Sequence, residues 1–303
     1  MKLLIIGGSG LIGSHILRAA KTAGHVVTGT YRTFPLPDLV PLDCADEGAA
    51  AALLRNQKPD AVVHAAGWTW VDGCEDDPAC AFEENARQPE RLARLCQTRG
   101  IHFTCFSTSY VFNGTQGPYA EEATPNPINV YSRSKWEGEQ RVQDACGGGV
   151  LIPRVIYVYG AEAQRKNFAY QVWRALTEGK TMRLPSDQCG NPTYAADIAR
   201  WLIALLEKRA AGIWNLAGPQ PDCTRDQWAE RLVSAFEAAG VKRNKAFAIE
   251  AVSTAALKQK ALRPLRAGML TQKLASLGLP PTDFTESIRQ MLQNDSEWYP
   301  LTR

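Results

Sequence analysis

The sequence lacks several features that would place the protein in a special class. No apolar run approaches the roughly 20 residues that a membrane-spanning helix requires. The opening Met-Lys-Leu-Leu-Ile-Ile-Gly-Gly is too short an apolar run for a signal peptide. The net charge is only +3 and the basic residues are scattered, which argues against partners such as nucleic acid or a membrane surface. The hydrophobic content of 45% and charged content of 21% are instead typical of a soluble globular protein.

Metal and disulfide patterns are also missing. The four histidines lie far apart, and the eight cysteines contain no Cys-x-x-Cys pair, so we predict no metal site. The alternative uses of cysteine are disulfides or zinc ligation. We favour reduced and mostly buried thiols, and with no export signal we expect a cytoplasmic protein.

What the sequence does contain is an alternation of short apolar runs with helical patterns. Such alternation predicts an α/β protein with a Rossmann-type, doubly wound parallel sheet. The predicted strands are 2–6, 25–30, 61–65, 101–107 and 150–157. The predicted helices are 11–22, 46–57, 75–99 and 129–145.

The pattern changes after Gly160, where helices dominate. We predict helices at 167–177, 195–208 and 225–239, with short strands near 181–184 and 212–217. The prediction is therefore a dinucleotide-binding domain over 1–160, with a return segment at about 190–215. Residues 161–303 would form mainly a smaller, interleaved C-terminal α/β substrate lobe.

A glycine-rich turn directly follows the first predicted strand and opens a helix. Its sequence is Gly7-Gly-Ser-Gly-Leu-Ile-Gly13, in the context that a dinucleotide fingerprint requires. Such glycines permit a tight turn and a close approach of the backbone to a pyrophosphate, which the helix N-terminus attracts. A turn without a ligand is the alternative. The predicted cofactor contacts in this turn are Gly7, Ser9, Gly10, Leu11, Ile12 and Gly13.

The end of the second strand discriminates between cofactors. An acid there would favour NAD, but the chain has Arg32, which suits the 2′-phosphate of NADP. A solvated surface arginine is the alternative. Asp43 falls where an acid would bond an adenine amino group, although it would serve equally well as a helix N-cap, the role we expect for Asp46.

A tyrosine and a lysine lie four residues apart in Asn129-Val-Tyr-Ser-Arg-Ser-Lys135. On a helix Tyr131 and Lys135 share one face, and a nearby cation lowers the pKa of a phenol. The pair is also common on ordinary amphipathic helices. Thr108 ends a predicted strand, where its hydroxyl would bond a substrate carbonyl, although such residues are routine turn formers.

Together these motifs resemble the extended short-chain dehydrogenase/reductases, and most closely the dTDP-4-dehydrorhamnose reductase family. The resemblance spans nearly the whole chain. It is carried by the glycine turn and by His64-Ala-Ala-Gly67, Ser107-Thr-Ser-Tyr-Val-Phe-Asn-Gly114, the Tyr131 and Lys135 segment, Arg154-Val-Ile-Tyr-Val-Tyr-Gly160, Trp70-Val-Asp-Gly-Cys-Glu-Asp-Asp-Pro78, Asp187-Gln-Cys-Gly-Asn-Pro-Thr193 and Ala261-Leu-Arg-Pro264.

The resemblance implies NADPH-dependent reduction of a nucleotide-linked 4-keto-6-deoxy sugar to its 4-hydroxyl. Tyr131 would protonate the carbonyl oxygen, Thr108 would bond the same oxygen, and Lys135 would tune Tyr131 and hold the nicotinamide ribose. Ala65, Ala66 and Gly67 would approach the cofactor with their backbone. The sequence does not decide the oligomeric state, and a homodimer is one of the options.

One position departs from the family. An acidic residue usually follows the catalytic threonine, and this chain has Ser109. Tyr157 stands where related enzymes often have tryptophan, and it would either stack on the substrate or pack within its strand. We take Ser109, Tyr157 and Arg263 as substrate-side candidates.

Two alternative functions follow from the same fold. The first is a nucleotide-sugar epimerase or dehydratase, but dehydration needs paired carboxylates, and Ser109 and Tyr110 are not acids. The second is a non-catalytic NADP-binding regulatory subunit like the beta subunit of methionine adenosyltransferase. The presence of the Thr108, Tyr131 and Lys135 set favours an enzyme over that subunit.

Overall fold

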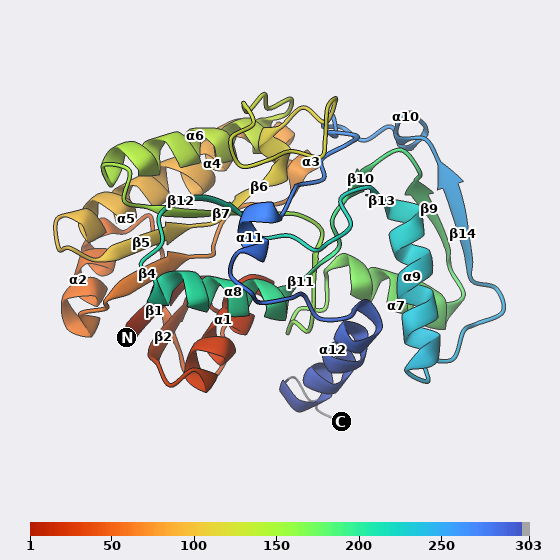
Figure 1. Cartoon of the computed structure of the whole chain (residues 1–303), viewed down its shortest axis with the longest axis horizontal. Helices are drawn as coiled ribbons and strands as arrows, with labels where there is room; N and C mark the ends of the chain where they lie inside the picture. The colour runs from red at the N-terminus through yellow and green to blue at the C-terminus, as the bar shows by residue number, and fades with distance from the viewer. Residues whose placement is uncertain (299–303) are drawn as a thin grey trace.

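The structure is a computed structural model that describes residues 1–298. A central sheet runs through its larger part, and its strands are all parallel (Figure 1). The strands pair in the order β12-β7-β5-β4-β1-β2-β3, with β6 beside β7. The chain therefore adds β2 and β3 on one side of β1, and then crosses to β4 on the other. This order confirms the predicted doubly wound fold, and it puts the topological switch point between β1 and β4.

The strands of this sheet are short and largely buried. Their bounds are β1 Lys2–Ile6, β2 Val26–Tyr31, β3 Leu39–Pro41, β4 Ala61–His64, β5 His102–Cys105, β6 Ser107–Thr108, β7 Leu151–Val155 and β12 Gly212–Asn215. Continuous burial of runs such as Leu3–Ile6 and Ala61–His64 fits a sheet that is covered on both faces.

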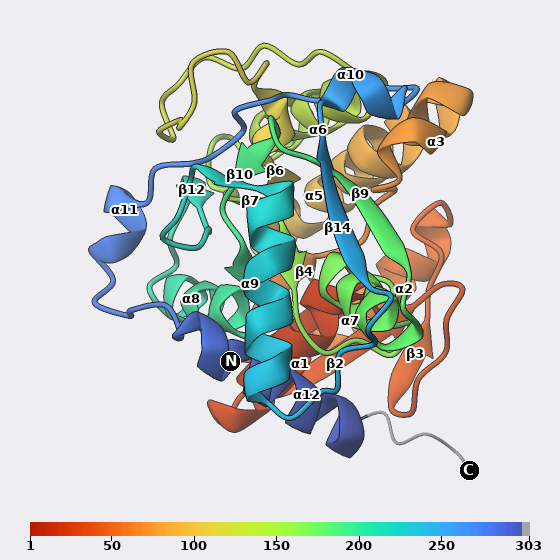
Figure 2. The same ribbon diagram turned by 90° about the vertical axis from the view of Figure 1, so that its right-hand side faces the viewer.

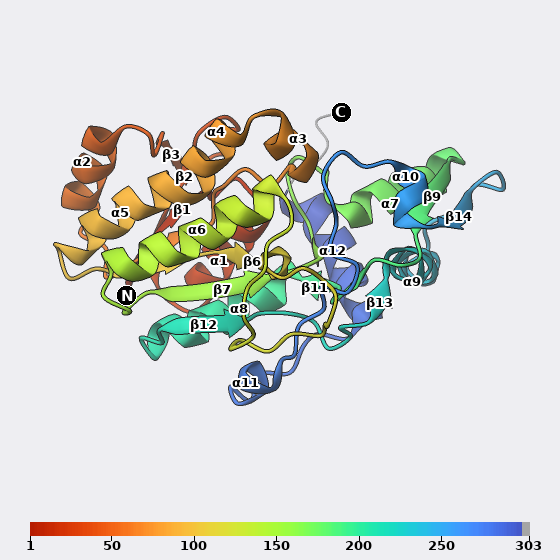
Figure 3. The ribbon, with the colours of Figure 1, turned by 90° about the horizontal axis from the view of Figure 1, so that it is seen from above.

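Helices cover the two faces of the sheet (Figure 3). On one face α1, Leu11–Thr22, packs with α8, Ala195–Glu207. On the other lie α2, Glu47–Gln57, α5, Gln88–Gln97, and α6, Val130–Ala145. Leu3 and Ile5 of β1 point into the first core and Leu4 and Ile6 into the second. This alternation is the two-residue period of a strand buried on both sides.

The long helix predicted over 75–99 is wrong, because the segment is broken into several pieces. These are α3, Val71–Asp76, α4, Pro78–Phe82, a π-helical turn, Glu83–Arg87, and α5. Asp77 ends the first piece and caps the next, which begins at Pro78. Pro89 has no N–H to donate to the carbonyl of Asn85, and the helix widens to a π turn at that point.

A second lobe follows the sheet (Figure 2). Its parallel pair β9 and β14 lies against α9, and its core contains buried residues of α7 and α9 with Ile288 and Met291 of α12. Its elements are β8 Val158–Tyr159, α7 Phe168–Glu178, β9 Thr181–Pro185, β10 Cys189–Gly190, β11 Thr193–Tyr194, β13 Cys223–Thr224, α9 Arg225–Ala238, β14 Ala248–Val252, α10 Thr254–Leu257, α11 Gln272–Ala275 and α12 Phe284–Trp298.

The chain crosses between the two parts more than once. The predicted return segment at about 190–215 contains α8, which packs on α1, and β12, which pairs with β7. Leu274 of α11 also belongs to the core beside α1 and α8. Among the elements that were not predicted are β3, β14 and α12. The strands β3 and β14 are short and partly exposed, so they lack a clear apolar pattern. The helix α12 follows a proline-rich joint.

Candidate active site

The glycine turn after β1 is built by close backbone contacts. Gly7 has a φ of +82°, and a Cβ on it would lie 3.0 Å from the backbone nitrogen of Ala66. A Cβ on Gly13 would lie 2.1 Å from the carbonyl oxygen of Gly7. Only glycine satisfies both positions without displacing the backbone. The turn is thus held against the loop after β4, on the carboxyl side of the sheet.

This turn presents a helix N-terminus that suits a phosphate group. Gly10 is the N-cap of α1 and has no side chain to cap the first-turn N–H groups, and Leu11 and Ile12 open the helix. Ser9 lies within the turn. The cradle therefore fits the pyrophosphate of a dinucleotide, which is an anion that a helix N-terminus attracts.

At the end of β2 the predicted arginine is not free. The Arg32 guanidinium donates to a carboxylate oxygen of Glu84, from the π-helical turn, and forms an ion pair with it. That hydrogen bond raises the pKa of Arg32. Oδ1 of Asp43 accepts the Ala45 N–H at 2.9 Å, so this acid caps its own turn, and Asp46 caps α2 as predicted.

The loop after β4 is clamped by one amide side chain. Oδ1 of Asn85 accepts the Trp68 N–H, and its Nδ2 donates both to the Trp68 carbonyl and to Ser134 Oγ, each at 3.0 Å. A Cβ on Gly67 would lie 2.8 Å from Asn85 Oδ1. Asn85 therefore joins the Ala65-Ala66-Gly67 loop to α6 at the residue before Lys135.

Thr108 and Tyr131 meet at the carboxyl end of the sheet. Thr108 ends β6, its hydroxyl accepts the Tyr110 N–H at 3.2 Å, and it lies close enough to the Tyr131 side chain to lower the pKa of that phenol in part. The ring of Tyr110 packs edge-on against that of Tyr131, with centroids 6.1 Å apart. The structure thus brings together two of the three predicted catalytic residues.

Lys135 completes the group from the next turn of α6. Its buried Nζ donates to the carbonyl oxygen of Phe106 at 2.6 Å, and it would lie 4.0 Å from a Cβ on Gly67. Burial lowers the pKa of Lys135, and the charges of Cys105 and Glu139 raise it in part. Lys135 is therefore placed between the loop after β4 and the strand end that carries Thr108.

The electrostatics of Tyr131 differ from the sequence expectation. Burial raises its pKa above the ordinary range, and the neighbouring Thr108 hydroxyl lowers it only in part. The net shift is therefore upward, opposite to the lowering that the sequence predicts. The phenol consequently keeps its proton through neutral pH, which is the form that donates one.

Three sets of hydrogen bonds fix the start of α6. Asn129 and Ser132 form a capping box, with the Ser132 N–H donating to Asn129 Oδ1 at 2.7 Å. The Val130 N–H donates to Glu75 at 2.8 Å, and the Asn129 amide donates to the Leu262 carbonyl at 2.8 Å. Tyr131 is therefore presented by a helix end that is anchored to both parts of the chain.

The substrate-side candidates have different environments. Ser109 is fully buried, so the structure does not support its direct contact with a substrate. Tyr157 has a φ of +47°, and its partly buried ring stacks on Trp228 with centroids 5.2 Å apart. Arg263 forms a 3.0 Å ion pair with Asp72 of α3, and so joins the second lobe to the sheet domain beside Leu262.

Sequence reasoning did not assign roles to Glu84 or Asn85. Both lie in the stretch that was predicted as one regular helix, and their contacts depend on the π turn. Asn85 could have been noticed as an amide side chain inside a helical pattern. A buried amide needs hydrogen-bond partners, so such a residue is a candidate for a structural role.

The other sequence expectations concern cysteines, metals and membranes. All eight cysteines are free thiols and seven of them are buried, as predicted. Among residues 1–298 no group of His, Cys, Asp or Glu side chains is placed to hold a metal ion. Over the same residues no helix combines the length and the apolar character needed to span a membrane.

The fold and the site define a class, the extended short-chain dehydrogenase/reductases, with a dinucleotide turn and a Thr-Tyr-Lys group. More specifically, the chain belongs to the RmlD substrate binding domain family, whose model matches residues 1–297. This membership confirms the resemblance predicted from the sequence motifs.

Individual relatives agree with the family. The chain is 35% identical over 274 residues to a probable low-salt glycan biosynthesis reductase of Haloferax volcanii, with 88% of each chain covered. It is 36% identical to a dTDP-4-dehydrorhamnose reductase of Burkholderia thailandensis, over 71% of this chain and 70% of the relative.

Solved structures show the same fold. A hypothetical dTDP-4-dehydrorhamnose reductase from Sulfolobus tokodaii matches with a TM-score of 0.81 at 27% identity, covering 95% of this chain and 99% of the other. The dTDP-4-dehydrorhamnose reductase of Bacillus anthracis, solved in complex with NADP, matches with a TM-score of 0.84 at 24% identity, covering 97% and 99%.

Proposed function

We propose that this chain is an NADP-dependent oxidoreductase that reduces the 4-keto group of a nucleotide-linked 4-keto-6-deoxy sugar. The observation that carries the proposal is the placement of Thr108 next to Tyr131, beside Lys135 and on the same side of the sheet as the glycine turn. The names of several relatives, among them dTDP-4-dehydrorhamnose reductases, support the same activity.

The residues divide the work between binding and proton transfer. The turn from Gly7 to Gly13, with Ser9, Gly10, Leu11 and Ile12, would hold the pyrophosphate. Arg32 would face the 2′-phosphate of NADPH, Asp43 the adenine, and the backbone of Ala65, Ala66 and Gly67 would lie along the cofactor. Bound NADPH supplies the hydride.

Proton delivery falls to the group at the start of α6. The neutral phenol of Tyr131 donates its proton to the carbonyl oxygen as negative charge develops there. Thr108 bonds the same oxygen and limits its movement. The Lys135 ammonium would stabilise the phenolate that remains after transfer, in addition to binding the nicotinamide ribose.

Fewer contacts support the substrate-binding residues than support the proton-delivery group. Tyr157 and Arg263 remain our candidates, with Arg263 positioned through Asp72 and Tyr157 through Trp228. We infer a division into a dinucleotide-binding domain and a substrate lobe from the second core around α7 and α9. The free thiols support a cytoplasmic location.

The activity is tested with a panel of nucleotide-linked 4-keto-6-deoxy sugars and NADPH. NADPH oxidation, with a 4-hydroxy sugar identified by NMR, is the expected result. A nucleotide-linked hexose that keeps its 6-hydroxyl is assayed alongside, and loss of water from it or its inversion, without net oxidation of NADPH, would identify a dehydratase or an epimerase. Tight binding of NADP(H) without turnover of any member of the panel would identify a non-catalytic binding subunit.

A further inference from the structure

Two opposite charges meet where the second strand ends. Arg32 directly follows β2, and Glu84 reaches it from a turn 52 residues further along the chain. The Glu84 side chain is 14% exposed and that of Arg32 is 46% exposed. Both side chains can therefore be reached from solvent, and the acid is the more enclosed of the two.

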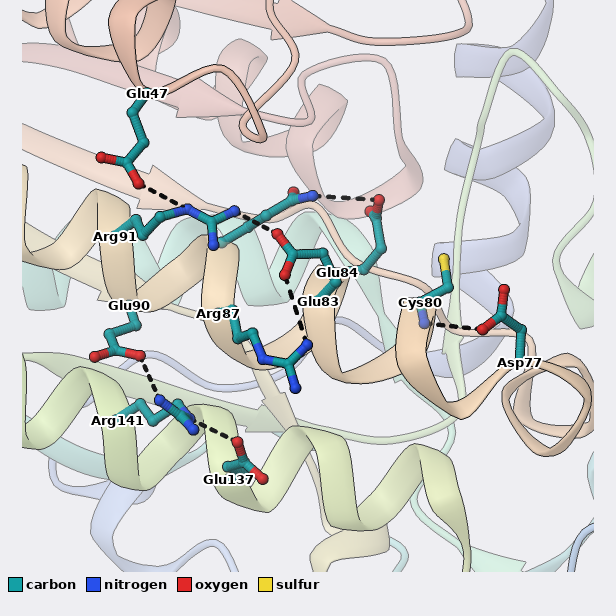
Figure 4. Close-up of polar contacts among 11 residues, drawn as sticks. Glu47, Asp77, Cys80, Glu83, Glu84, Arg87, Glu90, Arg91, Glu137 and Arg141 are labelled. Atoms are coloured by element: carbon teal, nitrogen blue, oxygen red, sulfur yellow. Dashed lines mark hydrogen bonds and ion pairs between the residues drawn. The ribbon is translucent and has the colours of Figure 1, made fainter.

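Neighbouring side chains fix the direction of Glu84. The amide of Gln88, a buried residue, lies 3.4 Å from the same oxygen that accepts from Arg32. Glu83, the residue before Glu84, points instead to Arg91 and to Arg87, whose guanidinium is 3.8 Å away (Figure 4). Two adjacent acids on the π turn thus serve different partners, and only Glu84 of the two contacts the end of β2.

The position of Glu84 has a chemical consequence for cofactor choice. An acid at this strand end accepts hydrogen bonds from the ribose 2′-hydroxyl of NAD, whereas an arginine accommodates the 2′-phosphate of NADP. This chain has both groups, the arginine directly after β2 and the acid from a distant segment. A 2′-phosphate bound by Arg32 would compete with the Glu84 carboxylate and would lie near a like charge.

We propose that Glu84 is a specificity-determining residue, which supplies the carboxylate that β2 lacks. It bonds the ribose 2′-hydroxyl of NAD(H) and competes with the 2′-phosphate of NADP(H) for Arg32. The site therefore accepts both dinucleotides, and its preference for NADP(H) is smaller than Arg32 alone would produce. This proposal rests on the proposed function, because it assumes that the glycine turn and Arg32 bind a dinucleotide.

The test is equilibrium binding of NADP⁺ and NAD⁺ by isothermal titration calorimetry, which needs no turnover. Glu84→Gln keeps the shape of the side chain and removes its charge, and we expect NADP⁺ to tighten relative to NAD⁺ on the order of tenfold. Glu83→Gln makes the same charge change one residue away, and it should leave the affinity ratio of the two dinucleotides as in the wild type.

An unchanged ratio in Glu84→Gln, or an equal shift in Glu83→Gln, would overturn the proposal while leaving NADP binding intact. If the wild-type chain binds neither dinucleotide, the proposed function itself fails. Adenosine 2′,5′-bisphosphate and 5′-AMP give a second comparison, since they differ only in the 2′-phosphate. Glu84→Ala must shift their ratio in the same direction as Glu84→Gln.

Discussion

The ammonium of Lys135 donates a 2.6 Å hydrogen bond to the backbone carbonyl of Phe106. Phe106 stands between β5 and β6, two residues before Thr108, so this bond ties the helix that presents Tyr131 to the strand end that presents its hydroxyl partner. The relative positions of the three side chains are thus set by one buried contact as well as by the helix repeat. A buried ammonium that is bonded to a backbone carbonyl is the arrangement we expect of a residue kept for chemistry.

Replacing Lys135 with methionine keeps the side-chain volume and removes the charge. We expect the turnover rate of NADPH oxidation to fall about 10²-fold or more, because the phenolate left by proton transfer loses its cation. Arg133→Met is the matched control, since Arg133 lies on the exposed face of the same helix. A rate within twofold of wild type for Lys135→Met would remove Lys135 from the mechanism.

Replacing Arg32 with alanine should weaken NADPH more than NADH. The variant removes the group that we propose to pair with the 2′-phosphate and leaves the Glu84 carboxylate without its partner, so a dianionic phosphate would meet an uncompensated charge. We expect the dissociation constant of NADPH to rise about tenfold or more, as measured by quenching of tryptophan fluorescence. Equal losses for the two dinucleotides would show that Arg32 does not contact the 2′-phosphate.

Arg154 and Glu139 form a buried bidentate ion pair behind the site, with bonds of 2.9 and 2.7 Å. Glu139→Gln leaves the guanidinium buried without its counter-charge, and we expect a loss of about 3–5 kcal/mol in the free energy of unfolding, measured in urea. The double variant Glu139→Leu with Arg154→Met removes both charges and should recover most of that loss. A cost below about 1 kcal/mol for Glu139→Gln would contradict this account of the pair.

Stability should fall as the pH drops from 7.5 to 5. Burial, with a smaller effect of Lys135, lowers the pKa of His64 from 6.5 to about 3. The unfolded chain therefore binds a proton below pH 6.5 that the folded chain refuses until about pH 3, so acid favours unfolding. At 1.36 kcal/mol per pH unit, His64 accounts for about 2 kcal/mol of that loss.

The matched variant for this effect is His64→Leu, which cannot take up a proton. Urea unfolding at pH 7.5 and 5 should show a pH-dependent loss smaller by about 2 kcal/mol than in the wild type. An identical loss in the two proteins would mean that His64 titrates normally in the folded state.

The fold was predictable because its signals are local. The strand, glycine turn and helix over Lys2 to Thr22 can be recognised from the residues of this one βα unit. Tyr131 and Lys135 share a face because of the helix repeat alone. The N-cap role of Asp46 is also local, because the N–H that it accepts belongs to Ala49, three residues further along the chain. Such features need no knowledge of which segments meet in space.

The features that could not be predicted from the sequence are contacts between distant segments. The pairing of Arg32 with Glu84, and of Arg263 with Asp72, depends on how the lobes and the π turn come together. The burial that raises the pKa of Tyr131 likewise comes from tertiary packing, and no helical spacing reports it. Pro89 was visible in the sequence, but a proline inside a helical pattern does not say whether the chain kinks, stops or forms a π turn.

The central claim is that Tyr131 delivers the proton during keto reduction. Tyr131→Phe removes one oxygen atom, and single-turnover oxidation of NADPH by a dTDP-linked 4-keto-6-deoxy sugar measures its effect. We predict a rate lower by about 10²–10⁴, the usual scale for a positioned proton donor, with NADP⁺ affinity unchanged. A wild-type rate in Tyr131→Phe would contradict the account.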